Sequence, residues 1–262
     1  MTPLIKKIIA NKKAELAFNK RLTPLQDIVK MALDSPAPRP FAKTILESKA
    51  KHKVIAEIKR ISPGTGFCRV HFEPESIARE YERGGAAALS VLTDTVYFGG
   101  SVFCVTHARE ATSLPVLRKD FIIDPYQIYE ARTHGADAVL LMAINFESAS
   151  QIEDMMANAR EAEVEILLEI HTEDELKFVP SSGVSVGINN RDFRDDKLKV
   201  DIDTTRKLAP LVKNANIVVS ESGIKDGATM EELEKIGVDA FLIGAAFMRA
   251  DDPGAALAKM LS

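Results

Sequence analysis

The feature that most constrains the fold is an alternation of short apolar runs with helix-like segments, repeated eight times after residue 53. The runs are rich in β-branched residues and leucine, which is typical of strands; they are 54–59, 87–93, 115–119, 138–143, 165–170, 185–189, 217–222 and 240–244. Several of the segments between them open with Pro, Asp or Thr, as helices do; they are 73–83, 101–111, 125–134, 147–162, 173–178, 201–207, 225–236 and 253–261. Strict alternation favours a parallel sheet with right-handed crossovers, and the count of eight favours a closed (β/α)8 TIM barrel. An open doubly wound sheet is the structural alternative.

The first 50 residues lie outside this count. Five apolar side chains share one stripe at helical spacing: Leu4, Ile5, Ile8, Ile9 and Leu16. We therefore expect 3–18 to be an amphipathic helix that packs on the barrel as a cap. Lys12 falls on the same stripe, and we expect its stem to lie along apolar surface with its charged end in water. The proline-rich segment 35–40 cannot be helical throughout, so 1–262 is predicted to be one barrel domain in which 1–50 form a cap and linker.

Composition excludes several classes of protein. The formal net charge is −4 with acidic and basic residues interspersed, which gives no electrostatic case for a nucleic acid or an anionic membrane as partner. Cys68 and Cys104 form no CxxC motif and the five histidines have no paired spacing, so neither a disulfide scaffold nor a metal site is predicted. Lys6 and Lys7 interrupt the N-terminal apolar residues, which argues against a signal peptide or membrane span. We expect a cytoplasmic monomer.

The first predicted strand carries charge on a face that ought to be apolar. Side chains alternate along a strand, so Glu57 and Lys59 share a face with Ile55. Both faces of a parallel sheet covered by helices are buried, and unpaired charges there cost several kcal/mol. The pair is therefore predicted to line a site. The alternative is an edge strand with a surface ion pair.

Other predicted strands also end in polar residues: Lys119, Glu169, Asn189, Glu221 and Ser222. By alternation, Glu169 shares the face of Leu167, and Asn189 that of Gly187, which places both polar side chains inside the barrel. Each group alone is equally well explained as a buried ion pair or amide. Together with Glu57 and Lys59, however, they lie on the barrel rim where enzymes of this fold place their sites.

Two segments predict an anion site. Ser222 and Gly223 follow the seventh predicted strand, and Gly244 and Ala245 follow the eighth. Small residues there let backbone N–H groups approach a phosphate. Opposite them, the glycine-containing loop 61–67 is predicted to move over the ligand, and the alternative is a plain surface turn.

These residues resemble the indole-3-glycerol-phosphate synthase family along nearly the whole chain. The matching segments are IAEIKR (55–60), SP (62–63), SVLTD (90–94), YFGGS (97–101), LRKDFI (117–122), LEI (168–170), GINNRD (187–192), ESGI (221–224) and LIG (242–244). The resemblance implies a cofactor-free reaction of tryptophan biosynthesis. In it, 1-(2-carboxyphenylamino)-1-deoxyribulose 5-phosphate closes to indole-3-glycerol phosphate, with loss of carbon dioxide and water. The partner would be this small phosphorylated substrate, with no nucleic acid and no membrane.

The resemblance also implies roles for the rim residues. Lys119 would be the general acid that polarises the ketone, Lys59 would hold the substrate carboxylate, and Glu169 or Glu57 would be the base. The sugar hydroxyls and the lysines would be ordered by Asn189, Arg191 and Glu221. Phe98 and Phe121 would contact the anthranilate ring, with the strand at 140–141 as a further apolar surface. Phosphate would be held by Ser62, Ser222, Gly223, Gly244 and Ala245.

The chain departs from the family pattern at two places, and three other functions are alternatives to the one that the resemblance implies. This chain has Gly64-Thr65 where the family commonly has serine after Ser-Pro, and Ala245 where it commonly has serine. Each lost hydroxyl is expected to weaken phosphate binding while the backbone donors remain. The other functions to be tested are a barrel isomerase of an amino sugar phosphate, a Schiff-base aldolase through Lys119, and a non-catalytic phosphate-binding scaffold.

Overall fold

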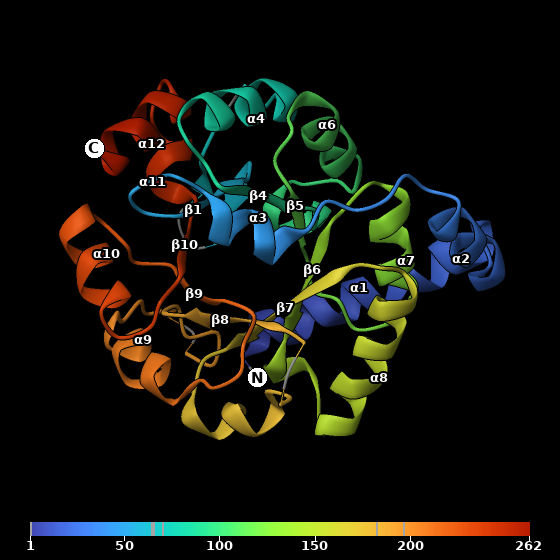
Figure 1. Cartoon of the computed structure of the whole chain (residues 1–262). Coiled ribbons are helices and arrows are strands. Elements are labelled where there is room, and N and C mark those ends of the chain that lie inside the picture. The colour runs from blue at the N-terminus through green and yellow to red at the C-terminus, as the bar shows by residue number, and fades with distance from the viewer. Residues whose placement is uncertain (1, 64–65, 70, 182, 196) are drawn as a thin grey trace.

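The computed structural model describes residues 2–63, 66–69, 71–181, 183–195 and 197–262. Eight parallel strands form a ring: β1 (Val54–Ile58), β4 (Ala88–Leu92), β5 (Val116–Lys119), β6 (Ala138–Met142), β7 (Glu165–Ile170), β8 (Ser185–Asn189), β9 (Val218–Glu221) and β10 (Ala240–Ile243). The barrel is closed because β1 pairs with both β4 and β10 (Figure 1). The predicted (β/α)8 barrel is confirmed, and the open-sheet alternative is wrong.

Helices surround the strands on the outside of the ring: α4 (Pro74–Arg83), α6 (Phe103–Ala111), α7 (Tyr126–Thr133), α8 (Ala149–Glu161), α9 (Asp203–Leu208), α10 (Gly227–Glu234) and α12 (Pro253–Leu261) (Figure 1). The predicted helix at 173–178 is a 3-10 helix, η2 (Glu173–Phe178). Several helices begin later than predicted because side chains cap them. The Ser148 hydroxyl accepts from Gln151 N, and Asp226 accepts from Thr229 N.

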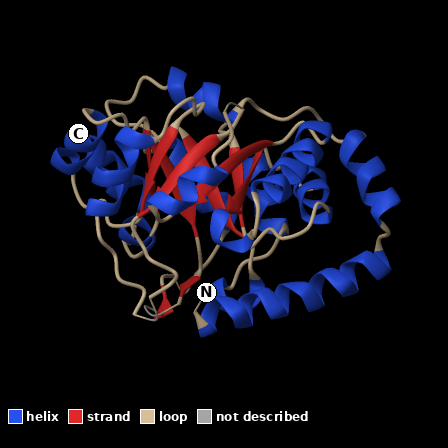
Figure 2. Ribbon diagram, turned by 90° about the horizontal axis from the view of Figure 1, so that it is seen from below, coloured by secondary structure: helices blue, strands red, loops and turns tan. Residues whose placement is uncertain are grey.

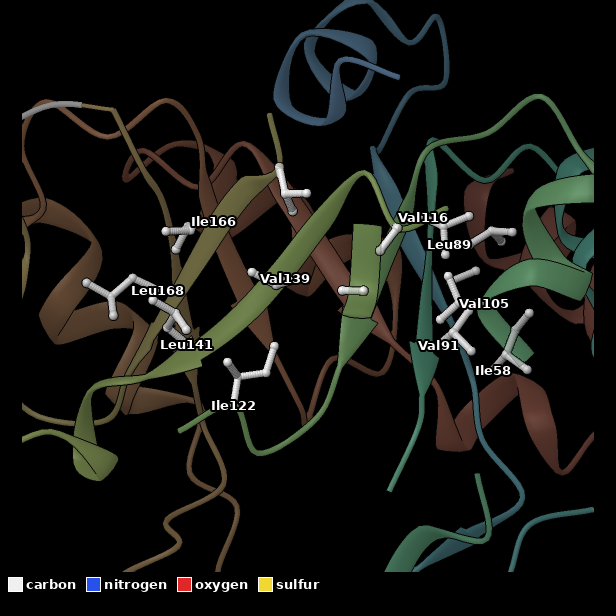
Figure 3. Close-up of a cluster of buried hydrophobic side chains, with 14 of the residues drawn as sticks. Ile58, Leu89, Val91, Val105, Val116, Ile122, Val139, Leu141, Ile166 and Leu168 are labelled. Carbon is white, nitrogen blue, oxygen red and sulfur yellow. The ribbon is translucent and has the colours of Figure 1, made fainter. Parts of the chain in front are cut away.

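Alternation along the strands separates two apolar clusters. Val54, Ala56 and Ile58 face the helices, in a cluster with Tyr81 of α4. Ile55 instead faces the barrel interior. Figure 3 shows the outward cluster, including Leu89 and Val91 of β4, and Val139 and Leu141 of β6. The inward face therefore combines this second apolar cluster with polar side chains near the carboxyl ends of the strands.

The N-terminal segment forms three helices: α1 (Pro3–Leu22), α2 (Leu25–Leu33) and α3 (Phe41–Glu47). α1 and α3 cover opposite ends of the barrel, and α2 packs against α7. Figure 2 shows α1 as the long helix that crosses one end of the strands. At the opposite end, the backbone N–H groups of Phe41 and Ala42 donate to the carboxylate of Glu165 at the start of β7, at 2.7 and 3.1 Å. One helix was expected, so α2 and α3 are additions. None of the described helices is long and apolar enough to span a membrane.

The expectation that Lys12 reaches water is wrong. Its side chain is only 1% exposed, and Nζ lies 3.0 Å from Oδ1 of Asp120 and 3.6 Å from Oδ2 of Asp94. Nζ also lies 2.9 Å from Oε2 of Glu15. The helical stripe was placed correctly, but carboxylates that follow β4 and β5 take the place of water around the ammonium.

Candidate active site

A pocket of about 210 Å3 lies at the carboxyl ends of the strands. The predicted polar, aromatic and anion-binding residues all line it: Glu57, Lys59, Ser62, Phe98, Lys119, Phe121, Glu169, Asn189, Arg191, Glu221, Ser222, Gly223, Gly244 and Ala245. Gly64 and Thr65 lie outside the described residues, so the departure there is not tested. The flanking residues of that loop form a short hairpin of β2 (Ile61–Ser62) and β3 (Gly66–Phe67).

Lys119, the last residue of β5, lies between two carboxylates. Its Nζ donates to Oε2 of Glu221 at 2.5 Å and to Oε2 of Glu169 at 3.1 Å. The same Glu169 oxygen accepts from Nδ2 of Asn189 at 3.1 Å. Burial alone would lower the pKa of Lys119, but the surrounding carboxylates outweigh burial and raise it. Lys119 is therefore held as a cation at the centre of the site.

The pKa values of the two carboxylates around Lys119 are shifted in opposite directions. Burial acts to raise the pKa of Glu169, but Lys119 and His171 outweigh burial and lower it. For Glu221, burial prevails over Lys119, and the nearby Glu169 charge adds to it, so the pKa is raised to about 7. Carboxylates whose pKa values are pushed apart in this way are suited to different steps of acid–base chemistry.

A second ion pair lines the same pocket. Glu57, on the inward face of β1, pairs with Nζ of Lys59, which follows the same strand. Both side chains are mostly buried, with 6% and 14% exposed. Gly244 at the end of β10 makes room for Glu57, because a Cβ there would overlap Oε1 of that carboxylate. The surface-ion-pair alternative for these charges is therefore wrong.

The anion-binding segment has an unusual backbone. Ser222 and Gly223 have φ values of 66° and 80°, a conformation that costs free energy for a non-glycine residue. Asn190 holds this turn: its Nδ2 donates to the carbonyl oxygens of Glu221 and Ser222 at 3.0 and 2.9 Å. Beside this turn, after the neighbouring strand β10, Ala245 is the first residue of the short helix α11 (Ala245–Met248).

Apolar side chains line the rest of the pocket. The rings of Phe98 and Phe121 lie with their centroids 6.1 Å apart. Leu140 lines the pocket, whereas Leu141 turns outward to the helices (Figure 3). Phe193 is a pocket residue that the sequence analysis missed. Its signal was an isolated aromatic residue in the otherwise charged stretch that follows the sixth predicted strand.

His171 was also missed. It lies behind the pocket wall, and its Nε2 is 3.2 Å from Oε1 of Glu169. Its position two residues after Glu169 was the available signal, because alternation directs both to the same side. Elsewhere in the part of the chain that the structure describes, no group of three or more His, Cys, Asp or Glu residues is arranged to hold a metal ion.

Comparison with known proteins identifies the family. A family model described as indole-3-glycerol phosphate synthase matches residues 5–260. The chain belongs to the indole-3-glycerol phosphate synthase family. Among its relatives, proteins named indole-3-glycerol phosphate synthase from Neisseria meningitidis serogroup B and Neisseria gonorrhoeae are each 45% identical over 266 residues. Each match covers 99% of this chain and 100% of the relative.

Solved structures agree with the barrel fold. A 3-hexulose-6-phosphate synthase from Salmonella typhimurium matches with a TM-score of 0.61 and 14% identity, covering 80% of this chain and 96% of that one. A thiamine phosphate pyrophosphorylase from Pyrococcus furiosus matches with a TM-score of 0.56 and 18% identity, covering 84% and 95%. At such low identity these two likenesses show the fold alone.

Proposed function

We propose that this pocket carries out the reaction of the indole-3-glycerol phosphate synthase family, without a cofactor. The anthranilate ring of 1-(2-carboxyphenylamino)-1-deoxyribulose 5-phosphate attacks the ketone carbon, and carbon dioxide and water leave to give indole-3-glycerol phosphate. The observation that carries the proposal is the placement of Lys119, a buried cation between Glu169 and Glu221 that faces the pocket.

Lys119 acts as the general acid. As the aromatic carbon attacks, negative charge develops on the ketone oxygen, and a positioned ammonium stabilises that charge and donates a proton. Glu221 and Asn189 order Lys119 and Glu169 through the contacts described above. With Arg191, which also lines the pocket, they are placed to bind the sugar hydroxyls.

The two anionic ends of the substrate match two parts of the pocket. Lys59 binds the carboxylate and exchanges its present partner Glu57 for it. The phosphate is bound at the carboxyl ends of β9 and β10, where Ser222, Gly223, Gly244 and Ala245 line the pocket together with Ser62. Phe98 and Phe121 contact the anthranilate ring.

Glu169 removes the proton that is lost during dehydration. The sequence left Glu169 and Glu57 open for this role. We favour Glu169 because it lies beside Lys119 and Asn189, whereas Glu57 is engaged by the lysine that is to hold the substrate carboxylate.

The alternatives fit the pocket less well. A Schiff-base lysine must be neutral to attack a carbonyl, and the raised pKa of Lys119, held by carboxylates against the effect of burial, keeps it protonated. An isomerase of an amino sugar phosphate needs one anion site, but this pocket offers Lys59 in addition to the phosphate segment. A non-catalytic scaffold gives no reason for burying Lys119 among carboxylates.

The test is indole fluorescence on mixing the protein with 1-(2-carboxyphenylamino)-1-deoxyribulose 5-phosphate. We expect a signal from the wild type and a loss of about 10²- to 10⁴-fold in kcat for Lys119→Ala, as for removal of a general acid. The exposed Lys213→Ala variant is the control and should retain the wild-type rate. A folded wild type that gives no signal would overturn the proposal, and a product trapped on Lys119 by borohydride would establish the aldolase instead.

The proposal also includes the cellular location and the oligomeric state of the enzyme. A cytoplasmic monomer remains our prediction, supported by two cysteines that are both free and buried. Analytical ultracentrifugation of the purified chain tests the monomer, and a dimer at micromolar concentration would contradict it.

A further inference from the structure

His171 is a buried titratable group that the chemistry above does not use. Its side chain is 1% exposed and does not line the pocket. Its Nε2 lies 3.2 Å from Oε1 of Glu169, and its Nδ1 lies 3.6 Å from Oε2 of Glu175. An imidazole between two carboxylates can face both with N–H groups only when both ring nitrogens carry protons.

The side of the ring away from Glu169 is fixed by the local backbone. Oε2 of Glu175 accepts from the backbone N–H of His171 at 2.5 Å and from that of Thr172 at 3.2 Å. These bonds belong to a capping box at the start of η2. The ring of Phe193 also packs edge-on against the imidazole, with centroids 5.7 Å apart and planes at 85°. The position of His171 is therefore set without help from Glu169.

The two oxygens of Glu169 have different partners. Oε2 faces the pocket and accepts from Lys119 and Asn189. Oε1 has no hydrogen-bond partner within the described residues, and its close contact is the imidazole of His171. Without that contact, a carboxylate that is 1% exposed would leave one oxygen unpaired or rotate away from Lys119.

We propose that His171 is a positioning residue that orients Glu169 so that one carboxylate oxygen stays on Lys119 and Asn189 in the pocket. The inference rests on the proposed function, because it assigns the orientation of the base in that reaction. His171 does not touch the substrate and acts only through Glu169.

The charges around the ring support a protonated imidazole. The groups that face it or influence it are Glu169 on β7, Glu175 on η2, and Asp192 and Arg194 in the loop after β8. Burial alone would lower the pKa of His171, but the carboxylates of Glu169 and Glu175 beside it outweigh burial and raise it to about 9. Glu169 therefore has a cation on each oxygen, His171 on one and Lys119 on the other.

The first test is the pH dependence of kcat in His171→Gln, which removes the charge. We expect kcat at pH 7.5 to fall roughly ten- to a hundredfold, the usual effect of a misplaced catalytic group. The acidic limb of the profile should move up by about 1–2 pH units, because a nearby cation lowers a carboxylate pKa by about 1–3 units. The control is His107→Gln, since His107 is half exposed and pairs with Glu75. An unshifted limb with a wild-type kcat in His171→Gln would overturn the inference.

A second test does not depend on activity, and its first readout comes from the wild type. The imidazole Cε1–H resonance of His171 is followed by NMR against pH in the wild type. We expect a protonated ring at pH 7.5 that loses its proton near pH 9, and Glu169→Gln should lower that midpoint by at least about one unit. A neutral ring at pH 7.5 would overturn the inference. An inactive wild type with a protonated His171 would instead contradict the proposed function while leaving the Glu169–His171 pair in place.

Discussion

At the scale of single residues, two glycines make room for carboxylates in the pocket. A Cβ at Gly187 would overlap Oε1 of Glu221, and one at Gly244 would overlap Oε1 of Glu57. Glu221 is the close partner of Lys119. The atom that Gly187→Ala would displace is the end of a flexible side chain, so we expect this variant to lose about 10²-fold in kcat while losing less than about 3 kcal/mol in the free energy of unfolding.

The measurement is indole formation beside urea unfolding, with Gly227→Ala as the matched control. A Cβ at Gly227 meets Nε2 of His52 at 3.5 Å, an ordinary contact. That variant should keep both the rate and the stability of the wild type. Equal rates for the two glycine variants would show that the position of Glu221 does not matter for the reaction.

Ala245 lines the phosphate end of the pocket at a position where the family commonly has serine. Ala245→Ser adds a hydroxyl next to backbone donors that are already present. A hydrogen bond to a charged group contributes about 1.5–3 kcal/mol, so inorganic phosphate should become a competitive inhibitor that binds at least about tenfold more tightly. Ala258→Ser, at an exposed position of α12 that does not line the pocket, is the control. No tighter binding in Ala245→Ser would count against a phosphate site at this position.

The pocket residues could be predicted from sequence because two simple rules place them. Alternation directs Glu57, Glu169 and Asn189 inward, and closure of the barrel gathers the ends of all strands on one rim. The contacts between strands could not be predicted. The space that Gly187 leaves for Glu221 and the ion pair of Lys119 on β5 with Glu221 on β9 depend on distances between strands that the order of residues does not give.

At the scale of elements, one buried ion cluster attaches α1 to the barrel. Lys12 is the cation, and Asp120 and Asp94 are fully buried carboxylates next to it. Asp120 adjoins both Lys119 and Phe121, and Asp94 caps the short helix α5 (Thr95–Phe98) that carries Phe98. Docking of α1 is thereby connected to the aromatic side of the pocket.

Removal of the Lys12 charge takes away the cation beside the buried Asp94 and leaves Asp120 with Arg118 as its cation. We expect Lys12→Ala to lower the free energy of unfolding by about 3–5 kcal/mol, as for breaking a buried pair. Lys13→Ala, at an exposed position of the same helix, should change it by less than about 0.5 kcal/mol. Urea unfolding of both variants tests this, and similar values for the two would mean that the cluster does not hold α1.

At this scale, the strands could be predicted from the sequence, whereas the short helices and the surroundings of Lys12 could not. The eight strands were placed to within about two residues because each is a continuous apolar run between turn signals. Helices of one or two turns, such as α3, α5 and α11, are too short to show a 3.6-residue period. The environment of Lys12 was predicted wrongly for a different reason. Amphipathic periodicity shows which face of α1 is buried, but it does not show that Asp94 and Asp120 of the barrel face Lys12 there.

At the scale of the whole molecule, buried ion pairs couple global unfolding to pH. The folded state raises the pKa of His171 from 6.5 to about 9, so it binds a proton that the unfolded state releases between these values. The free energy by which this proton stabilises the folded state is fully present below pH 6.5 and is lost as pH rises through 9. One pKa unit corresponds to about 1.4 kcal/mol, which sets the contribution at about 3 kcal/mol.

The wild type is therefore expected to unfold less readily than His171→Gln by about 3 kcal/mol at pH 6, with the difference shrinking towards zero by pH 9.5. Taking the difference between two proteins cancels the titration of groups that both share. Urea unfolding across this range is the measurement, and the half-exposed His107→Gln variant should follow the wild type, since exposed ion pairs contribute little. A difference that stays constant with pH would mean that His171 stabilises the barrel by packing, not by its charge.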